Sequence, residues 1–266
     1  DYAIISVKSY DTEWATWLAK SCVKPDGAFV SAQNGINDER IGAIAGRDRT
    51  LGCVVTISAG MYEPGHVIRT DTNQVGFEIG ELNGSDSARS HELAAIMSSV
   101  AETHATTNLL GLRWSKLMVN SMANALAGLT GYGAAQVRTV PEVRRVSIQL
   151  GAEAVRVAKA LGYRLDPVMG ISPEAIVDAA DGRDVEQVEM RLMESAKRNP
   201  GGRPSFGQDV LKGRRTEIDY LNGYVAEQGK KAGVKTPYSD KIVAIVHSLG
   251  VGFKPDPERI APLVKM

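Results

Sequence analysis

The sequence predicts an α/β protein with a parallel sheet over residues 1–104 and an all-helical part over residues 105–266. Near the start, short apolar runs alternate with helical patterns, which is typical of a parallel sheet covered by helices. After residue 105 the apolar positions recur only at helical spacing. No segment rich in proline or glycine separates the two parts, so we place the boundary where the strand pattern ends.

The composition excludes several classes of protein. The 266 residues are 43% hydrophobic, which is enough to bury one large core or two modest ones. Lys plus Arg and Asp plus Glu both number 31, so no net positive charge is available to hold nucleic acid or a membrane surface. No apolar run approaches the roughly 18 residues of a membrane span, and no signal-peptide pattern opens the chain. We therefore expect a cytoplasmic protein.

The cysteines and histidines give no sign of a metal or redox site. Cys22 and Cys53 lack metal-binding or redox spacing, and we expect both to be buried thiols. No pair of histidines has the spacing of zinc ligands. The histidines are His66, His91, His104 and His247.

Two polar residues end the first two predicted strands. A strand over residues 1–8 ends at Lys8 and precedes a helix that Asp11 or Thr12 caps. A second strand over residues 28–32 precedes Asn34 and a helix over about residues 38–45. Because ligands of parallel sheets bind beyond the carboxyl ends of the strands, Lys8 and Asn34 together favour a cofactor crevice. Polar residues also commonly end strands, so a purely structural interpretation of each stays open.

The phosphate-binding loop of such a crevice is not found in its usual place. No G-x-G-x-x-G pattern lies near the start, and the similar Gly131-Tyr132-Gly133 follows a helix and has Gln136 in place of the last glycine. A dinucleotide-binding domain would need two more βα units, about 60 residues. We therefore expect this numbering to start inside a longer protein.

Residues 51–82 show a strand pattern again. The runs LGCVVTIS, GHVIRT and QVGFEIG are rich in valine and isoleucine and are separated by turns. We expect them to extend the sheet with antiparallel strands, followed by a helix over about residues 90–103. The further predicted helices cover residues 112–128, 141–161, 173–180, 185–197, 205–229 and 237–249.

The stretch RWSKLMVNSMANALAGLTG, residues 113–131, places polar side chains in an otherwise apolar helix. Lys116, Asn120 and Asn124 lie four residues apart. A step of four residues rotates a helix position by only about 40°, so the three share one stripe. A helix that is apolar nearly all round is typical of an interior, where an unpaired polar group costs roughly 1–3 kcal/mol. The stripe therefore requires partners.

Two interpretations of this stripe stay open. In the structural one, the asparagines bridge helices and the lysine reaches the surface along its own stem. In the functional one, an ammonium group in apolar surroundings gives a proton to a developing alkoxide, while the two amides orient a small polar substrate.

A second informative stretch is RPSFGQDVLKGRRTEIDYLNGY, residues 203–224. Ser205 followed by Gln208 fits a capping box, which makes the start of a helix its first predicted role. A helix start also offers N–H groups to a carboxylate. Glu217 lies among apolar residues of the same predicted helix, where a lone glutamate is more often on a solvated face.

These motifs resemble those of the ketopantoate reductases, which are 2-dehydropantoate 2-reductases. The resemblance includes WSKLMVNSMANALAGLTG, SFGQDVLKGRRTEIDYLNGY, GVKTPYSDKIVAIV, ISVKSYDT and SAQNGI, and it covers essentially the whole chain. It implies that residues 1–104 are the remainder of a Rossmann-type NADP-binding domain. It also implies that residues 105–266 are a helical substrate domain of the 6-phosphogluconate-dehydrogenase-like type.

The implied reaction is the NADPH-dependent reduction of ketopantoate to pantoate in pantothenate and coenzyme A biosynthesis. By resemblance, Lys116 is the general acid that protonates the carbonyl oxygen as hydride arrives from the nicotinamide. Glu217 holds a hydroxyl group of the substrate. These roles agree with the functional interpretation of the stripe, because an oxo acid bearing a hydroxyl requires a proton donor and a hydroxyl acceptor.

The resemblance also implies the binding residues. Asn120 and Asn124 orient the substrate, Ser205 contacts its carboxylate, and Lys8 and Asn34 line the cofactor side near the nicotinamide. The implied partner is a small-molecule 2-oxo acid. The sequence leaves the oligomeric state open, with a homodimer as one alternative. The charge balance and the scattered histidines give no reason to expect a nucleic acid, a membrane or a metal as a partner.

Three features depart from the family pattern. Most importantly, the family's glycine loop and the basic residue that recognises the 2′-phosphate are not found in these 266 residues. Asp11 replaces a glutamine that many members have, and the segment after Asn34 is one residue shorter than is common. The preference for NADPH over NADH depends on the resemblance alone.

Two alternative functions stay open: a related reductase of another 2-oxo or 3-oxo acid, and a cofactor-dead helical module for binding or dimerisation. Glu217 distinguishes the first alternative, because a substrate without a hydroxyl has no use for it.

Overall fold

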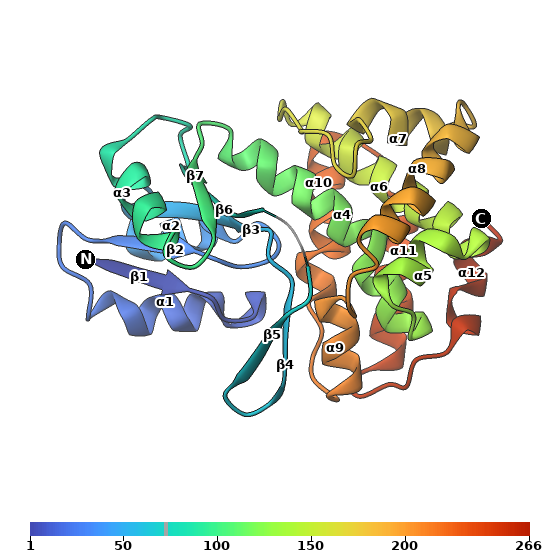
Figure 1. Ribbon diagram of the computed structural model, residues 1–266, viewed down its shortest axis with the longest axis horizontal. Coiled ribbons are helices and arrows are strands. Elements are labelled where there is room, and N and C mark those ends of the chain that lie inside the picture. The colour runs from blue at the N-terminus through green and yellow to red at the C-terminus, as the bar shows by residue number, and fades with distance from the viewer. Residues whose placement is uncertain (72–73) are drawn as a thin grey trace. The chain divides into compact units, whose positions relative to one another are not determined.

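The computed structural model describes residues 1–71 and 74–266, apart from the side chain of Tyr62. The chain divides into two units, each described here by itself (Figure 1). The first unit contains Asp1–Ile57 and Thr72–Arg113, and the second contains Ser58–Asp71 and Trp114–Met266. The division into a cofactor-binding part, residues 1–104, and a substrate-binding part, residues 105–266, stays a prediction.

The first unit is built on a five-stranded sheet with the strand order β1-β2-β3-β6-β7. β1, β2 and β3 are parallel, β6 runs antiparallel to β3, and β7 is parallel to β6. The strands are β1 Tyr2–Ile5, β2 Ala28–Ser31, β3 Thr50–Val55, β6 Val75–Glu81 and β7 Glu102–Ala105. The predicted α/β class with a mostly parallel sheet is therefore confirmed.

Helices cover both faces of this sheet (Figure 1). Val30 packs in a cluster with Leu93 of α3, while its neighbour Phe29 packs on the other face with Ile41 of α2. Because successive strand residues point to opposite faces, a strand covered on both sides must be apolar throughout. The helices of this unit are α1 Thr12–Lys20, α2 Asp38–Ala45 and α3 Ala88–Met97, with short 3₁₀ helices η1 Ser9–Asp11 and η2 Arg47–Arg49.

A buried ion pair fixes the loop that follows β2. The guanidinium of Arg113 donates to the carbonyl oxygens of Ser31 at 2.7 Å and Gln33 at 2.9 Å, and to Asp38 Oδ1 at 2.8 Å. The side chains of Arg113 and Asp38 are only 1% and 0% exposed. The carbonyls come from the end of β2 and the carboxylate from the first residue of α2, so this contact holds both ends of the loop that contains Asn34.

The substitution Asp38→Ala should therefore strongly destabilise the protein. It leaves the guanidinium of Arg113 buried without a counter-ion, which typically costs 3–5 kcal/mol. Urea denaturation followed by circular dichroism measures the change in the free energy of unfolding. The matched control is Asp178→Ala, which breaks an ion pair with Arg183 whose side chains are 42% and 60% exposed. The control should lose less than about 1 kcal/mol, and equal losses in the two variants would contradict the prediction.

The second unit is almost entirely helical, as predicted. Its first helix, α4, spans Leu109–Thr130 and starts within the first unit. The other α-helices are α5 Ala134–Thr139, α6 Pro141–Ala160, α7 Pro173–Ala180, α8 Val185–Arg198, α9 Ser205–Leu211, α10 Asn222–Ala232, α11 Pro237–Leu249 and α12 Ala261–Val264. Short 3₁₀ helices are η3 Ile218–Tyr220 and η4 Pro257–Ile260. Among the described residues, no helix combines the length and apolar character needed to cross a bilayer.

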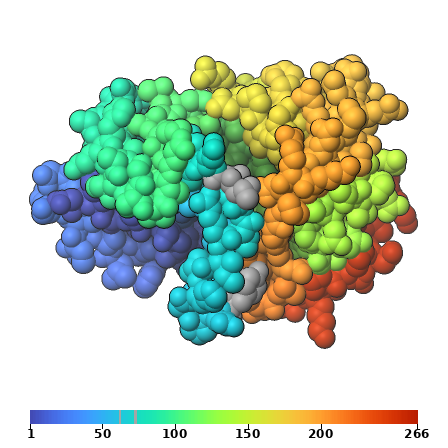
Figure 2. All heavy atoms as spheres, viewed as in Figure 1, coloured from blue at the N-terminus to red at the C-terminus, as the bar shows by residue number. Residues whose placement is uncertain are grey.

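A hairpin from the strand-rich segment also belongs to the second unit. β4 Ala59–Glu63 pairs with β5 His66–Arg69 in a separate two-stranded sheet. Lys212, just after α9, donates from Nζ to the carbonyl oxygen of Met61 at 2.9 Å, and Figure 2 shows the cyan hairpin beside the orange segment of α9. The expectation that GHVIRT extends the main sheet is therefore wrong. Its residues are exposed on both faces of the hairpin, whereas strands of the main sheet are buried.

Two further expectations about secondary structure are wrong. The helix expected over residues 90–103 ends at Met97, and residues 102–105 form β7, because pairing with β6 outweighs local helical periodicity. The helix expected over residues 205–229 is broken after Leu211, where Gly213 has a φ of 62° and reverses the chain direction. Cys22 also differs from expectation, because it is exposed while Cys53 is buried.

Candidate functional site

The predicted polar stripe lies on α4. Lys116 and Asn120 are half-buried, and Asn124 is only 5% exposed. Leu117 and Met118, on the rest of the helix, are each 1% exposed, which agrees with an interior helix. The amide nitrogen of Asn120 is buried and has no hydrogen-bond partner among the described residues. This nitrogen is a donor in apolar surroundings whose position suits the oxygen of a ligand.

The stripe continues to Gly128, where α9 packs against α4. A Cβ atom at position 128 would overlap the ring of Phe206, and Val210 is the next neighbour. The missing side chain at Gly128 therefore lets α9 approach the backbone of α4 closely. Because Ser205 directly precedes Phe206, this contact brings the first turn of α9 against the end of the stripe.

Ser205 does not start α9 by the predicted capping box. Pro204 is at the N-cap position, where it has no side-chain acceptor, and Ser205 is the first residue of the helix. The side-chain nitrogen Nε2 of Gln208 instead donates to the carbonyl oxygen of Arg203 at 3.0 Å. A serine that caps a helix directly precedes its first residue, whereas Ser205 is itself that first residue. The predicted capping role of Ser205 is therefore wrong.

Glu217 lies in a buried turn and not on a helical face. It directly precedes η3, and its carbonyl oxygen accepts from the backbone N–H groups of Tyr220 at 3.0 Å and Leu221 at 3.1 Å. The residue is only 5% exposed, so the solvated-face interpretation is wrong. Its carboxylate is a strong hydrogen-bond acceptor held away from bulk water, so Glu217 stays a candidate for binding a ligand hydroxyl.

The segment after Glu217 is attached to α4 by two contacts. Asn222, the first residue of α10, donates from its amide nitrogen to the carbonyl oxygen of Ser121 at 3.3 Å. The ring of Tyr224 lies 5.8 Å from that of Trp114 on α4. The sequence analysis did not single out Asn222, although it lies in the run TEIDYLNGY of the second informative stretch, five residues after Glu217.

The structure brings the loops of Lys8 and Asn34 together in the first unit. Each residue lies three positions beyond the end of its strand, at the carboxyl ends of the neighbouring parallel strands β1 and β2. The hydroxyl of Ser9 donates to the carbonyl oxygen of Asn34 at 3.3 Å, and the amide nitrogen of Asn37 donates to the same oxygen at 3.0 Å. Whether these loops line a cofactor stays a prediction, and so do the roles of the five residues in the second unit.

The second unit thus combines groups suited to one kind of chemistry. An ammonium group and two amides share a helix, and the segments that carry a hydroxyl and a buried carboxylate both contact that helix. Such groups can protonate an oxyanion and bind hydroxyl and carboxylate groups. Among the described residues, no group of three or more His, Cys, Asp or Glu side chains is placed to hold a metal ion.

Comparison with known families agrees with this arrangement. Residues 108–250 match the family described as Ketopantoate reductase PanE/ApbA C terminal, and residues 1–84 match Ketopantoate reductase PanE/ApbA. The chain belongs to the ketopantoate reductase family, which is a family of oxidoreductases. The predicted family and the Rossmann-like fold class are therefore confirmed.

Relatives in this family have modest identity and cover most of the chain. The 2-dehydropantoate 2-reductase of Halobacterium salinarum is 30% identical over 241 residues, which are 89% of this chain and 72% of that protein. The 2-dehydropantoate 2-reductase of Archaeoglobus fulgidus is 26% identical over 254 residues, which are 95% of this chain and 77% of that protein.

Solved structures of two kinds of enzyme are equally similar. The ketopantoate reductase family protein of Ralstonia eutropha JMP134 has a TM-score of 0.74 and 25% identity, covering 93% of this chain and 75% of that chain. The D-mandelate dehydrogenase in complex with NADH and anilino(oxo)acetate has a TM-score of 0.75 and 26% identity, with the same coverage of 93% and 75%. Family membership therefore leaves the choice of 2-oxo acid to the residues of the site.

The substitution Asn120→Ala should separate stability from function. The variant removes a buried amide nitrogen that has no partner, so the free energy of unfolding should not fall, while kcat/KM for a 2-oxo acid should drop at least about fivefold. Urea denaturation and steady-state kinetics provide the two measurements. The matched control is Gln149→Ala, a half-buried amide whose nitrogen donates to the carbonyl oxygen of Ala180 at 2.9 Å. This control should lose about 1 kcal/mol of stability and keep its activity; the reverse pattern would contradict the interpretation of Asn120.

Proposed function

We propose that this protein reduces 2-dehydropantoate to pantoate with hydride from NADPH. The observation that carries the proposal is the stripe of Lys116, Asn120 and Asn124 on α4, with an unpaired amide nitrogen at its centre and the segments of Ser205 and Glu217 packed against the same helix. Membership of the ketopantoate reductase family supports it, and so do relatives named 2-dehydropantoate 2-reductase.

In the proposed mechanism, Lys116 is the general acid. A bound nicotinamide would supply hydride to the carbonyl carbon of the 2-oxo acid. The carbonyl oxygen then takes up negative charge, and the ammonium group of Lys116 gives this oxygen its proton, so that a 2-hydroxy acid forms and the lysine is left neutral. Asn120 and Asn124 donate to oxygens of the substrate and hold the carbonyl group in line with the lysine. Apolar neighbours on α4 strengthen these interactions by excluding water.

The two ends of the substrate would be bound by different segments. Glu217 accepts a hydrogen bond from the hydroxyl group of ketopantoate, which a buried carboxylate does strongly. The hydroxyl of Ser205 donates to the substrate carboxylate. Lys8 and Asn34 would line the cofactor beyond the carboxyl ends of β1 and β2, where parallel sheets bind their ligands.

The substitution Lys116→Ala should lower kcat by about 10²–10⁴-fold, which is the usual contribution of a general acid. The free energy of unfolding should change little, because the lysine is half-buried at the start of the stripe. Stopped-flow oxidation of NADPH with ketopantoate measures the effect. Lys235→Ala, at an exposed lysine of the same unit, is the matched control and should leave kcat unchanged. Unchanged turnover in the Lys116→Ala variant would exclude the mechanism.

The substitution Glu217→Ala should lower the enzyme's selectivity for a hydroxyl-bearing substrate. A suitable substrate pair is ketopantoate and 3,3-dimethyl-2-oxobutanoate, which differ only in the hydroxyl group. Loss of a hydrogen bond to a charged acceptor should reduce kcat/KM for ketopantoate by about 10- to 100-fold, with little effect on the second acid. Equal losses for both acids would mean that Glu217 does not hold the hydroxyl.

A second candidate function is the reduction of another 2-oxo acid. The similarity to D-mandelate dehydrogenase, with a TM-score of 0.75, favours this alternative specifically, because the acid in that complex is anilino(oxo)acetate. An enzyme of this kind would prefer phenylglyoxylate to ketopantoate, and Glu217→Ala would then have no effect on its selectivity. Comparing kcat/KM for the two acids in the unmodified protein distinguishes the two functions.

The choice of cofactor has its own test. The D-mandelate dehydrogenase complexes contain NADH, whereas our proposal is NADPH. Fluorescence titration with each reduced cofactor measures the two dissociation constants directly. Binding of neither cofactor would favour the alternative that the protein is a binding or dimerisation module.

The homodimer also stays a prediction, which light scattering of the purified protein can test. A ketopantoate reductase of the same fold from Staphylococcus aureus is described as dimeric.

A further inference from the structure

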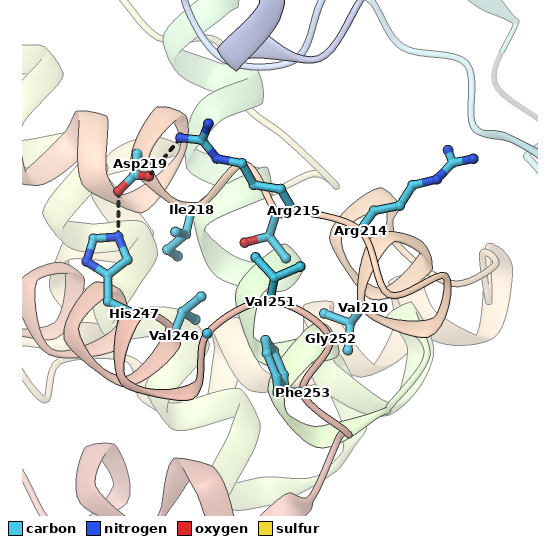
Figure 3. Close-up of a pocket in the computed structure, with 12 residues that line it drawn as sticks. Val210, Arg214, Arg215, Ile218, Asp219, Val246, His247, Val251, Gly252 and Phe253 are labelled. Carbon is cyan, nitrogen blue, oxygen red and sulfur yellow. Dashed lines mark hydrogen bonds and ion pairs between the residues drawn. The ribbon is translucent and has the colours of Figure 1, made fainter.

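The turn that carries Glu217 is supported unequally on its two sides. Asn222, which follows the turn, contacts α4. A hollow of about 190 Å³ opens beside the residues that flank Glu217 (Figure 3). We call the Asn222 contact the inner side of the turn and the hollow its outer side. Thr216 and Ile218, the residues on either side of Glu217, line this hollow together with Val246 and Phe253. None of the predicted substrate residues lines it. Ile218 is itself only 3% exposed, so the outer side holds the turn by apolar burial, which tolerates small shifts.

The polar contacts on the outer side are exposed. Asp219 accepts a hydrogen bond from His247 of α11 at 2.7 Å, with side chains that are 42% and 55% exposed, and Arg215 lies 4.0 Å from Asp219 (Figure 3). Exposed pairs of this kind contribute little to the position of a backbone segment, because water competes for both partners. They hold the outer side of the turn only weakly.

The contact on the inner side is fully buried. Asn222 is 0% exposed, and its amide nitrogen donates to the carbonyl oxygen of Ser121, which is the residue next to Asn120 on α4. A hydrogen bond without access to water is difficult to exchange for another one, so it fixes the distance between the two segments. It thus connects the backbone that follows η3 to the helix of the polar stripe.

The buried amide of Asn222 is also unfavourable for stability. Its carbonyl oxygen Oδ1 has no hydrogen-bond partner among the described residues, and neither has the nearby hydroxyl of Ser121. An unpaired buried oxygen is destabilising, and leucine, with almost the same shape, would avoid this penalty. Stability alone therefore does not explain an asparagine at this position.

We propose that Asn222 is a positioning residue that sets the substrate specificity of the enzyme by holding the Glu217 turn against α4. It does not contact the substrate and acts through Glu217. This inference rests on the proposed role of Glu217 as the group that binds the substrate hydroxyl.

The first test concerns the turn itself and requires no activity. In the variant Asn222→Leu, the backbone amides of Tyr220 and Leu221, which donate to the carbonyl oxygen of Glu217, should exchange with deuterium about 5- to 30-fold faster, which corresponds to partial loss of one local contact. The free energy of unfolding, from urea denaturation, should stay the same or rise. Asn222→Ala removes the same donor with a smaller side chain, and should give the same change in exchange if the leucine variant does not fold.

The second test measures specificity with ketopantoate and 3,3-dimethyl-2-oxobutanoate. Asn222→Leu should lower the selectivity for ketopantoate by about 5- to 30-fold, mainly through KM, and should add nothing further in the Glu217→Ala background, because both changes remove the same interaction. The matched control is His247→Ala, which removes the exposed contact on the outer side of the turn. It should leave both amide exchange and selectivity within about twofold of the unmodified protein.

The outcomes distinguish failure of the positioning role of Asn222 from failure of the proposed function. Unchanged exchange in Asn222→Leu, or equal losses for both acids together with a lower free energy of unfolding, would overturn the positioning role. If the unmodified protein itself does not prefer ketopantoate, the proposed function fails, and the amide-exchange result still decides whether Asn222 holds the turn.

Discussion

Pairing of the polar groups buried along α4 is the constraint on which the rest of this structure depends. An unpaired buried donor costs about 1–3 kcal/mol, so each one indicates either a protein partner or a ligand. At Arg113 the protein supplies acceptors to both terminal nitrogens of the guanidinium, namely the carbonyl oxygens of Ser31 and Gln33 and the carboxylate of Asp38, and only Nε is left unpaired among the described residues. At Asn120, two turns later in the same helix, the amide nitrogen has no acceptor among the described residues. The same helix therefore has a structural polar group near its start and, in the proposed function, a substrate-binding one at its centre.

The segments that complete the site reach α4 through small and polar residues. Gly128 lets the ring of Phe206 approach the helix backbone, and Asn222 hydrogen-bonds to the carbonyl oxygen of Ser121. Apolar packing is tolerant of small shifts, because one contact can replace another of similar area. A glycine contact and a directional hydrogen bond are less tolerant. They fix α9 and the start of α10 along the helix, as the proposed site would require in order to discriminate between similar acids.

The sequence was most informative where local signals define both ends of an element. The helices at residues 38–45, 173–180 and 237–249 were predicted with their observed bounds, because an acidic residue or proline starts each of them and a glycine or a turn follows. The sequence was least informative where residues far away in the chain determine the local structure. β7 is only four residues long and depends on pairing with β6. Ser205 matches a capping box, but the helix already includes Ser205 and has Pro204 at its N-cap. Glu217 is buried in a turn after a helix break near Gly213, which the helical pattern conceals. The stripe of Lys116, Asn120 and Asn124 could be recognised from spacing alone, whereas the missing partner of Asn120 required the structure.

The fold does not choose between substrates. A ketopantoate reductase family protein and D-mandelate dehydrogenase resemble this chain equally, with TM-scores of 0.74 and 0.75. Reduction of a 2-oxo group needs a hydride, a proton donor and groups that hold the carbonyl, and a polar stripe on one helix can supply the last two for either acid. Discrimination requires a contact that only one substrate can make. In the proposed function the carboxylate of Glu217 makes this contact. It lies in a turn that borders a hollow on one side and is followed by a buried hydrogen bond to α4. On this view, specificity within the family can change through the residues that support this turn while the reaction chemistry on α4 stays the same.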